Sequence, residues 1–245
     1  HHPALFGFFQ TAEKIMLSGN AKRLRCIIPV LIADHFEMSE QDCLNYGIIV
    51  EMVHYTSLTH DDVIDQDMYR RGCETLNNNF SNSQAILLGD YILCMALQKC
   101  QKFTHNQQVT NMVVRMVQSL ITGVIIEQKE LPKDPTIEHY RKMAEMKTGS
   151  LFSLSFGLPF VGSDKVTDAV NCGAFFGTMF QIYDDFVDRF DDDPGINAFL
   201  LFSPEEMVSL WDETVANFLA ITKRLGLEKP VLFLLNHLQK IGYFS

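Results

Sequence analysis

Apolar residues recur at steps of three and four along most of the chain, the period of a helix buried on one face. In the segment 39–67, Tyr46, Ile49, Val50 and Val53 follow this spacing. The same pattern predicts a helix opening near Lys22 and others over 83–103, 107–129, 137–156, 166–190, 204–225 and 230–241. Sustained alternation of apolar and polar residues, which is typical of strands, is absent from the sequence. The pattern therefore predicts an all-α protein.

Turn-forming residues separate the predicted helices. The segment 131–135 ends one helix before Thr136 caps the next, and 157–164 separates another pair. The polar run 77–83 is predicted to be a loop that leads into a helix cap. Neither an internal repeat nor a Gly/Ser-rich linker is present, so residues 1–245 are expected to form a single domain.

Composition and charge exclude several classes of protein. Apolar residues make up 47%, too many for a wholly disordered chain, and the net charge of −10 argues against binding nucleic acid through overall charge. No uninterrupted apolar run is long enough to span a bilayer, and the first residues lack the layout of a signal peptide. The six cysteines form no CxxC pair, which favours buried, reduced thiols over disulfides or a zinc site. A cytoplasmic location is therefore expected.

Two acidic clusters of identical spacing are the main candidates for chemistry. Asp61, Asp62 and Asp65 close one apolar helix, and Asp184, Asp185 and Asp188 close another. Carboxylates four residues apart share a helical face and repel one another, whereas Mg²⁺ takes carboxylate ligands together with substrate phosphates. A solvated acidic helix end explains one such cluster. Two copies flanked by apolar residues favour a metal site.

Basic residues lie close to these acids in sequence. Lys22, Arg23 and Arg25 open an early helix, and Arg70 and Arg71 directly follow the first acidic cluster. Exposed ion pairs are one explanation, worth about 0–1 kcal/mol each. Binding of a diphosphate is the other, because Arg and Lys side chains bind phosphate oxygens that a metal ion does not reach.

At this point the sequence resembles a known family, the trans-isoprenyl (polyprenyl) diphosphate synthases. The segment 50–60 (VEMVHYTSLTH), the first aspartate cluster and Arg70-Arg71-Gly72 look like the family's first aspartate-rich region. The segments 173–177 and 180–185 resemble the second, and 88–91 and 147–152 match in kind and order. The resemblance runs from Ser18 to Phe190 and is strongest to medium- and long-chain members such as octaprenyl diphosphate synthase.

The resemblance implies the isoprenoid-synthase fold, a single large helical bundle around a central cavity. It implies condensation of isopentenyl diphosphate with an allylic diphosphate (geranyl, farnesyl or geranylgeranyl), assisted by Mg²⁺. The implied metal ligands are Asp61, Asp62, Asp65, Asp184 and Asp188. Catalytic roles are implied for Asp61, Asp62, Asp65, Arg70, Lys147, Asp184 and Asp185. The implied allylic contacts are Arg70, Lys147, Thr148 and Gln181, and the implied isopentenyl contacts are Lys22, Arg25, His54 and Arg71.

Product length is expected to depend on the helix face below the first cluster. Thr56 and Ser57, five and four residues before Asp61, are small where short-chain members of the family carry bulky aromatic residues, and Val53 lies deeper. The resemblance therefore implies an open tunnel and an all-trans product of C20 or longer. It also implies a homodimer, with transient membrane contact for release of a long apolar product.

The sequence departs from the family pattern in two places. Ala21 stands where the family usually has Gly, and the Gly-Lys loop that normally follows the second cluster is largely missing at 191–198. Either the chain has lost this loop, or the sequence in hand omits a mobile segment there; we favour the omission. Residues 199–202 are expected to begin the next helix.

Two other functions remain open at this stage. A class I terpene cyclase shares the metal chemistry but usually replaces the second aspartate cluster with an Asn/Ser/Glu pattern. A non-catalytic subunit of a heteromeric synthase is the other alternative, although both aspartate clusters are intact.

Overall fold

The computed structural model describes residues 3–17, 21–129, 135–190 and 196–244, and it confirms the all-α prediction. The longer helices are α1 (Pro3–Leu17), α2 (Leu24–His35), α3 (Glu40–Ile64), α5 (Asn82–Cys100), α6 (Asn106–Lys129), α9 (Val166–Asp188), α11 (Pro204–Leu225) and α12 (Glu228–Lys240). The shorter helical elements are α4 (Leu76–Asn79), α7 (Ile137–Ala144), the π-helix η1 (Glu145–Gly149), α8 (Ser150–Gly157), the 3₁₀ turn η2 (Leu158–Phe160) and α10 (Ala198–Leu201). Two-residue strands β1 (Tyr69–Arg70) and β2 (Cys73–Glu74) pair antiparallel.

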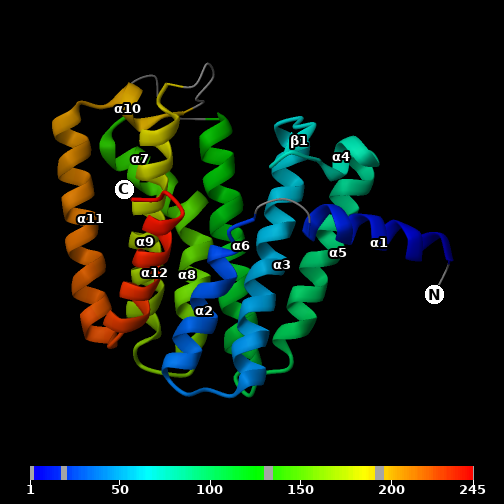
Figure 1. Ribbon diagram of the computed structural model, residues 1–245, viewed down its shortest axis with the longest axis horizontal. Coiled ribbons are helices and arrows are strands. Elements are labelled where there is room, and N and C mark those ends of the chain that lie inside the picture. The colour runs from blue at the N-terminus through cyan, green and yellow to red at the C-terminus, as the bar shows by residue number, and fades with distance from the viewer. Residues whose placement is uncertain (1–2, 18–20, 130–134, 191–195, 245) are drawn as a thin grey trace.

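Most of the long helices run side by side as a bundle in which α8 and α9 lie between α11 and α6, whereas α1 lies crosswise to them (Figure 1). One apolar core joins α2, α8, α9, α11 and α12 around the fully buried Phe152, Phe176 and Phe218. A second core joins α3, α5, α6 and α8 around the buried Ile49 and Val113. α8 belongs to both cores and contacts α3 as well as α9, so it connects the two helices.

Helix boundaries follow the capping chemistry of the sequence. Ser39 caps α3 by accepting a hydrogen bond from the Asp42 amide at 3.1 Å. Thr136 caps α7 as predicted, in a reciprocal pair with His139. Gly226 ends α11 in the left-handed conformation with φ of 76°, which a glycine adopts at little steric cost.

Several local predictions are wrong in detail. Residues 76–79 form a helical turn that overlaps the start of the predicted loop, and residues 198–201 form a separate turn rather than the start of α11. Ser203 explains the second difference, since its hydroxyl caps a new helix that begins at Pro204. The predicted helix 137–156 is interrupted by η1, and α1 was not predicted. Residues 191–195, most of the segment with the expected missing loop, lie outside the described residues, and that expectation stays a prediction.

All six cysteines are free thiols, but the prediction that they are buried holds only for Cys43, Cys100 and Cys172, because Cys94 is exposed and the other two are partly buried. Burial raises the pKa of Cys172 and of Cys26 to about 12, so both stay protonated at neutral pH. In the part of the chain that is described, the span Asn106–Gln128 of α6 is long and apolar enough to cross a membrane on length and composition alone. Only 28% of the most apolar stretch of this span is buried in the protein, although α6 contacts α5, α7, α8 and η1.

Candidate active site

The first aspartate motif lies at the C-terminal end of α3. Asp62 is buried and forms an ion pair with Arg70, whose strand β1 turns back toward the helix. Asn77 donates a hydrogen bond to the backbone carbonyl of Asp62 at 3.2 Å. Asp61, in contrast, forms no side-chain hydrogen bond or ion pair with any described residue. Burial raises its pKa to about 6, and the nearby Lys147 acts in the opposite direction.

The second motif lies at the C-terminal end of α9. The buried Asp185 accepts hydrogen bonds from Gln181 at 2.7 Å, from the Tyr140 hydroxyl at 2.8 Å and from the Ala198 amide at 3.0 Å. Asp184 takes no part in this network and has no hydrogen bond or ion pair to a described side chain. Burial raises its pKa to about 7, opposed by the charge of Arg25. Each motif therefore has an engaged inner carboxylate and an available outer one.

Lys147 and Thr148 lie on η1, between the two motifs. The hydroxyl of Thr148 donates to Gln181, which connects η1 to Asp185. The ammonium of Lys147 pairs with Glu127 of α6 and opposes the rise that burial causes in the pKa of both Asp61 and Asp185, so its charge lies near both motifs. The structure thus brings together the four residues implied to bind the allylic substrate with parts of both acidic clusters.

A second group of predicted residues surrounds a separate cavity of about 270 Å³. Its lining includes all four residues implied to bind isopentenyl diphosphate, Lys22, Arg25, His54 and Arg71, together with Asp184. Nε of Arg25 and Nδ1 of His54 are buried there without a hydrogen-bond partner among the described residues. Because buried polar atoms are normally satisfied, they indicate a site for a polar ligand.

The protonation states of two lining residues favour anion binding in this cavity. Burial lowers the pKa of Arg25 to about 10, which keeps the guanidinium charged at neutral pH. Burial and the neighbouring arginines hold the pKa of His54 well below its ordinary value, so this imidazole is neutral. His54 can therefore donate a hydrogen bond without adding a positive charge.

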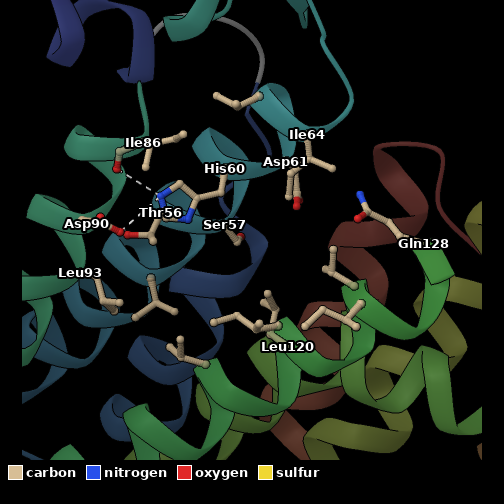
Figure 2. A pocket seen from close by; sticks show the side chains of 16 residues that line it. Thr56, Ser57, His60, Asp61, Ile64, Ile86, Asp90, Leu93, Leu120 and Gln128 are labelled. Atoms are coloured by element: carbon tan, nitrogen blue, oxygen red, sulfur yellow. Dashed lines mark hydrogen bonds and ion pairs between the residues drawn. The ribbon is translucent and has the colours of Figure 1, made fainter. Parts of the chain in front are cut away.

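A third cavity, of about 420 Å³, extends from Asp61 between α3, α5 and α6. Val53, Thr56 and Ser57, the predicted chain-length residues, line it on the α3 side. The hydroxyl of Ser57 bonds back to the His54 carbonyl at 2.8 Å, which leaves the cavity wall largely apolar. Figure 2 shows Leu120 of α6 across the cavity from Ser57, with Asp61 and Gln128 toward one end.

Sequence reasoning missed several residues of these sites. The α6 wall, with Leu120 and Ile121, carries no motif and is found only from the packing of α6. Tyr140 and Glu127 sit in ordinary helical patterns, with no local signal for their partners. Tyr243 lies beside the second cavity, and the Lys22 ammonium lies 3.6 Å from its ring centre.

The chemistry of the two motifs fits Mg²⁺ bound together with a diphosphate. No three acidic, His or Cys side chains among the described residues converge closely enough to hold a metal ion by themselves. Asp61 and Asp184 are partly buried carboxylates with no hydrogen-bonding partner in the described part of the chain, and each lies beside a cation. Because Mg²⁺ is usually bound by one or two carboxylates plus substrate phosphates, this incomplete donor set suits it.

Comparison with known proteins gives a consistent result. The family model for polyprenyl synthetase matches residues 8–197. Nonaprenyl diphosphate synthase of Mycobacterium tuberculosis is 31% identical over 179 residues, which cover 71% of this chain and 53% of that protein. The chain spans about half to two thirds of the length of the curated relatives that it matches most strongly.

Solved structures share the fold over nearly the whole chain. An isoprenoid synthase family member from Thermotoga neapolitana has a TM-score of 0.84 at 25% identity, covering 98% of this chain and 93% of its own. A geranyltransferase from Helicobacter pylori, solved with magnesium and isoprenyl diphosphate, has a TM-score of 0.71 at 21% identity, covering 93% and 86%. These matches confirm the predicted isoprenoid-synthase fold.

Proposed function

The chain belongs to the polyprenyl synthetase family, and we propose that it condenses isopentenyl diphosphate head-to-tail onto an allylic diphosphate to give an all-trans polyprenyl diphosphate. The observation that carries this proposal is that both cavities are lined by α3, the apolar one by residues such as Ser57 and the basic one by residues such as His54. Asp61 lines the apolar cavity, and Asp184 lines the basic one. One substrate can therefore place its chain in the first and the other its diphosphate in the second.

Residues near both motifs would hold the allylic diphosphate. Lys147 and Arg70 supply positive charge, and Thr148 and Gln181 supply hydrogen bonds. Asp61, Asp65, Asp184 and Asp188 would be the metal ligands, with Asp62 as a further candidate that Arg70 already engages. When bound, Mg²⁺ would neutralise charge that develops on the departing diphosphate.

The apolar cavity supports the ionisation step. Departure of diphosphate leaves an allylic carbocation, which water would quench, and the apolar side chains from Val53 to Leu120 offer water no hydrogen bonds beside it. Arg25 and Lys22 would hold isopentenyl diphosphate in the neighbouring basic cavity, so that its double bond attacks the cation. A proton is then lost, and we assign its acceptor as the released diphosphate.

Incubation with Mg²⁺, farnesyl diphosphate and isopentenyl diphosphate tests the proposal. Elongated diphosphates are expected. Cyclic hydrocarbons would support a terpene cyclase instead, and absence of any reaction would support a non-catalytic subunit.

Product length is the finer part of the proposal, and we expect C20 or longer. Ser57→Phe is expected to fill the cavity and to shift the products to shorter chains, measured by chromatography. Thr56→Phe tests the same wall, although Thr56 is buried and its hydroxyl bonds the Gly89 carbonyl at 3.2 Å. Ser209→Phe, exposed on α11, is the control. A length distribution that Ser57→Phe leaves unchanged would contradict the open-tunnel interpretation.

We also propose a homodimer in which a second copy covers the exposed apolar face where α5 and α6 meet. Ile86, Ile121 and Ile125 line the apolar cavity and are still 43–50% exposed. Ile121→Glu is expected to give monomers in sedimentation velocity, and Leu219→Glu on α11 is the matched exposed control. A cytoplasmic location, with transient membrane contact during product release, completes the proposal.

A further inference from the structure

Glu127 is an acidic residue of the site that belongs to neither aspartate motif. It lies on α6, and its carboxylate forms an ion pair with the ammonium of Lys147 on η1. The two side chains are 25% and 33% exposed, so both are accessible to a ligand.

Close backbone packing places this pair. Gly123 lies one turn before Glu127 on α6, and a Cβ atom there would come within 2.4 Å of the Lys147 amide nitrogen. A side chain at this position would therefore push η1 away from α6. The contact fixes the point at which the Lys147 side chain leaves its backbone, directly beside the turn that carries Glu127.

The direction of the Lys147 ammonium then depends on Glu127. A lysine side chain has four rotatable bonds, so ordering it costs rotamer entropy. Its ammonium has three N–H donors, so one can bind Glu127 while two remain for phosphate oxygens. The neighbouring Thr148 is fixed separately, through its hydrogen bond to Gln181.

We propose that Glu127 is a positioning residue that holds the Lys147 ammonium between the two aspartate motifs, ready to bind the diphosphate of the allylic substrate. This inference rests on the proposed function, because it assigns Lys147 to the allylic site. If Glu127 and Lys147 formed only an ordinary surface ion pair, removing Glu127 would change the stability slightly and leave substrate binding unaffected.

A double-mutant cycle tests the inference. Glu127→Gln is expected to raise the KM for the allylic diphosphate about tenfold while the KM for isopentenyl diphosphate changes less than twofold. Lys147→Gln is expected to have an equal or larger effect. Adding Glu127→Gln to Lys147→Gln should then change the allylic KM no further, because Glu127 acts through Lys147. Glu127→Asp, which keeps the charge, should restore part of the affinity.

Glu213→Gln is the matched control, since Glu213 forms a bidentate ion pair with Arg141 at 2.8 and 2.7 Å on the exposed side of α7. It should leave both KM values unchanged. The inference would be overturned if Glu127→Gln raised the allylic KM equally in the parent protein and in Lys147→Gln. It would also be overturned if Glu127→Gln raised the KM of both substrates equally.

Calorimetric titration of the same variants with Mg²⁺ and inorganic pyrophosphate separates this inference from the proposed function. Pyrophosphate binding needs no turnover, so a protein that fails to elongate any primer still reports on Glu127. About tenfold weaker binding by Glu127→Gln supports the positioning role, and unchanged binding contradicts it.

Discussion

At the end of α3 the inner carboxylate, Asp62, is held by the charged side chain of Arg70, whereas at the end of α9 the inner carboxylate, Asp185, is held by Tyr140, Gln181 and a backbone amide of α10. The two motifs have the same spacing and the same position on a helix. One is stabilised by an opposite charge and the other by neutral hydrogen-bond donors.

The residues that bind the two inner carboxylates also differ in how far along the chain they lie from them. Arg70 lies 8 residues after Asp62, within the turn that follows the helix. Tyr140 lies 45 residues before Asp185, and Ala198 lies 13 residues after it. The first motif is therefore a local structure, and the second depends on the packing of α7, α9 and α10. Identical spacing fixes which carboxylates face outward and leaves open how the inner one is held.

The largest effect is expected from the outer carboxylates, where the two motifs should behave alike. Asp61→Asn and Asp184→Asn each replace a partly buried carboxylate that we propose to bind Mg²⁺ with a neutral amide, and are expected to lower kcat/KM about 10³-fold, a change of several kcal/mol in transition-state stabilisation. Steady-state kinetics at saturating Mg²⁺ measure it. Asp168→Asn, at the opposite end of α9, is the control. A decrease of less than tenfold at either outer position would show that this motif is not a metal site.

The inner carboxylates should separate the two motifs. Arg70→Gln leaves buried Asp62 without its cation and is expected to lower the free energy of unfolding by about 2 kcal/mol. This is less than for a fully buried pair, because Arg70 is 33% exposed. Tyr140→Phe removes one of three donors to Asp185 and is expected to cost about 1 kcal/mol. Urea-induced unfolding without metal measures both. A larger loss of stability in Tyr140→Phe than in Arg70→Gln would contradict this comparison.

This contrast also explains what the sequence could predict. Asp61, Asp62 and Arg70 are close neighbours in sequence, and the helical period alone brings them together. The period also predicts most of the long helices, whose boundaries at Thr136 and Ser203 carry local capping signals.

The remaining features depend on contacts between distant segments. Tyr140, Glu127 and Leu120 look like ordinary helix residues, and their roles appear only when α6 and α7 pack beside α9 and α3. The π-helix η1 was also unforeseen, because nothing in its own sequence marks the close approach of Gly123. Side-chain hydrogen bonds across such distances leave no period in the sequence.

The smallest effect, on stability against pH, distinguishes the two outer carboxylates. Burial raises the pKa of Asp61 to about 6 and of Asp184 to about 7, from an ordinary value of 3.8. Well below pH 3.8 both carboxyl groups are protonated in the folded and in the unfolded protein, so their burial costs no stability from charge. As the pH rises, the unfolded chain ionises first, so the metal-free protein loses stability up to pH 6 through Asp61 and up to pH 7 through Asp184.

Asparagine at either position removes this loss. Relative to the parent protein in EDTA, Asp184→Asn is expected to gain about 1–2 kcal/mol at pH 8 and less at pH 5, a value reduced from the full pKa shift because the side chain is partly exposed. The gain in free energy of unfolding from Asp184→Asn should still grow between pH 6 and pH 7, whereas the gain from Asp61→Asn should change much less there. Urea unfolding at pH 5, 6, 7 and 8 measures both curves. Coincident curves would mean that the two outer carboxylates lie in equivalent environments, and that the neighbouring cations, Lys147 for one and Arg25 for the other, do not distinguish them.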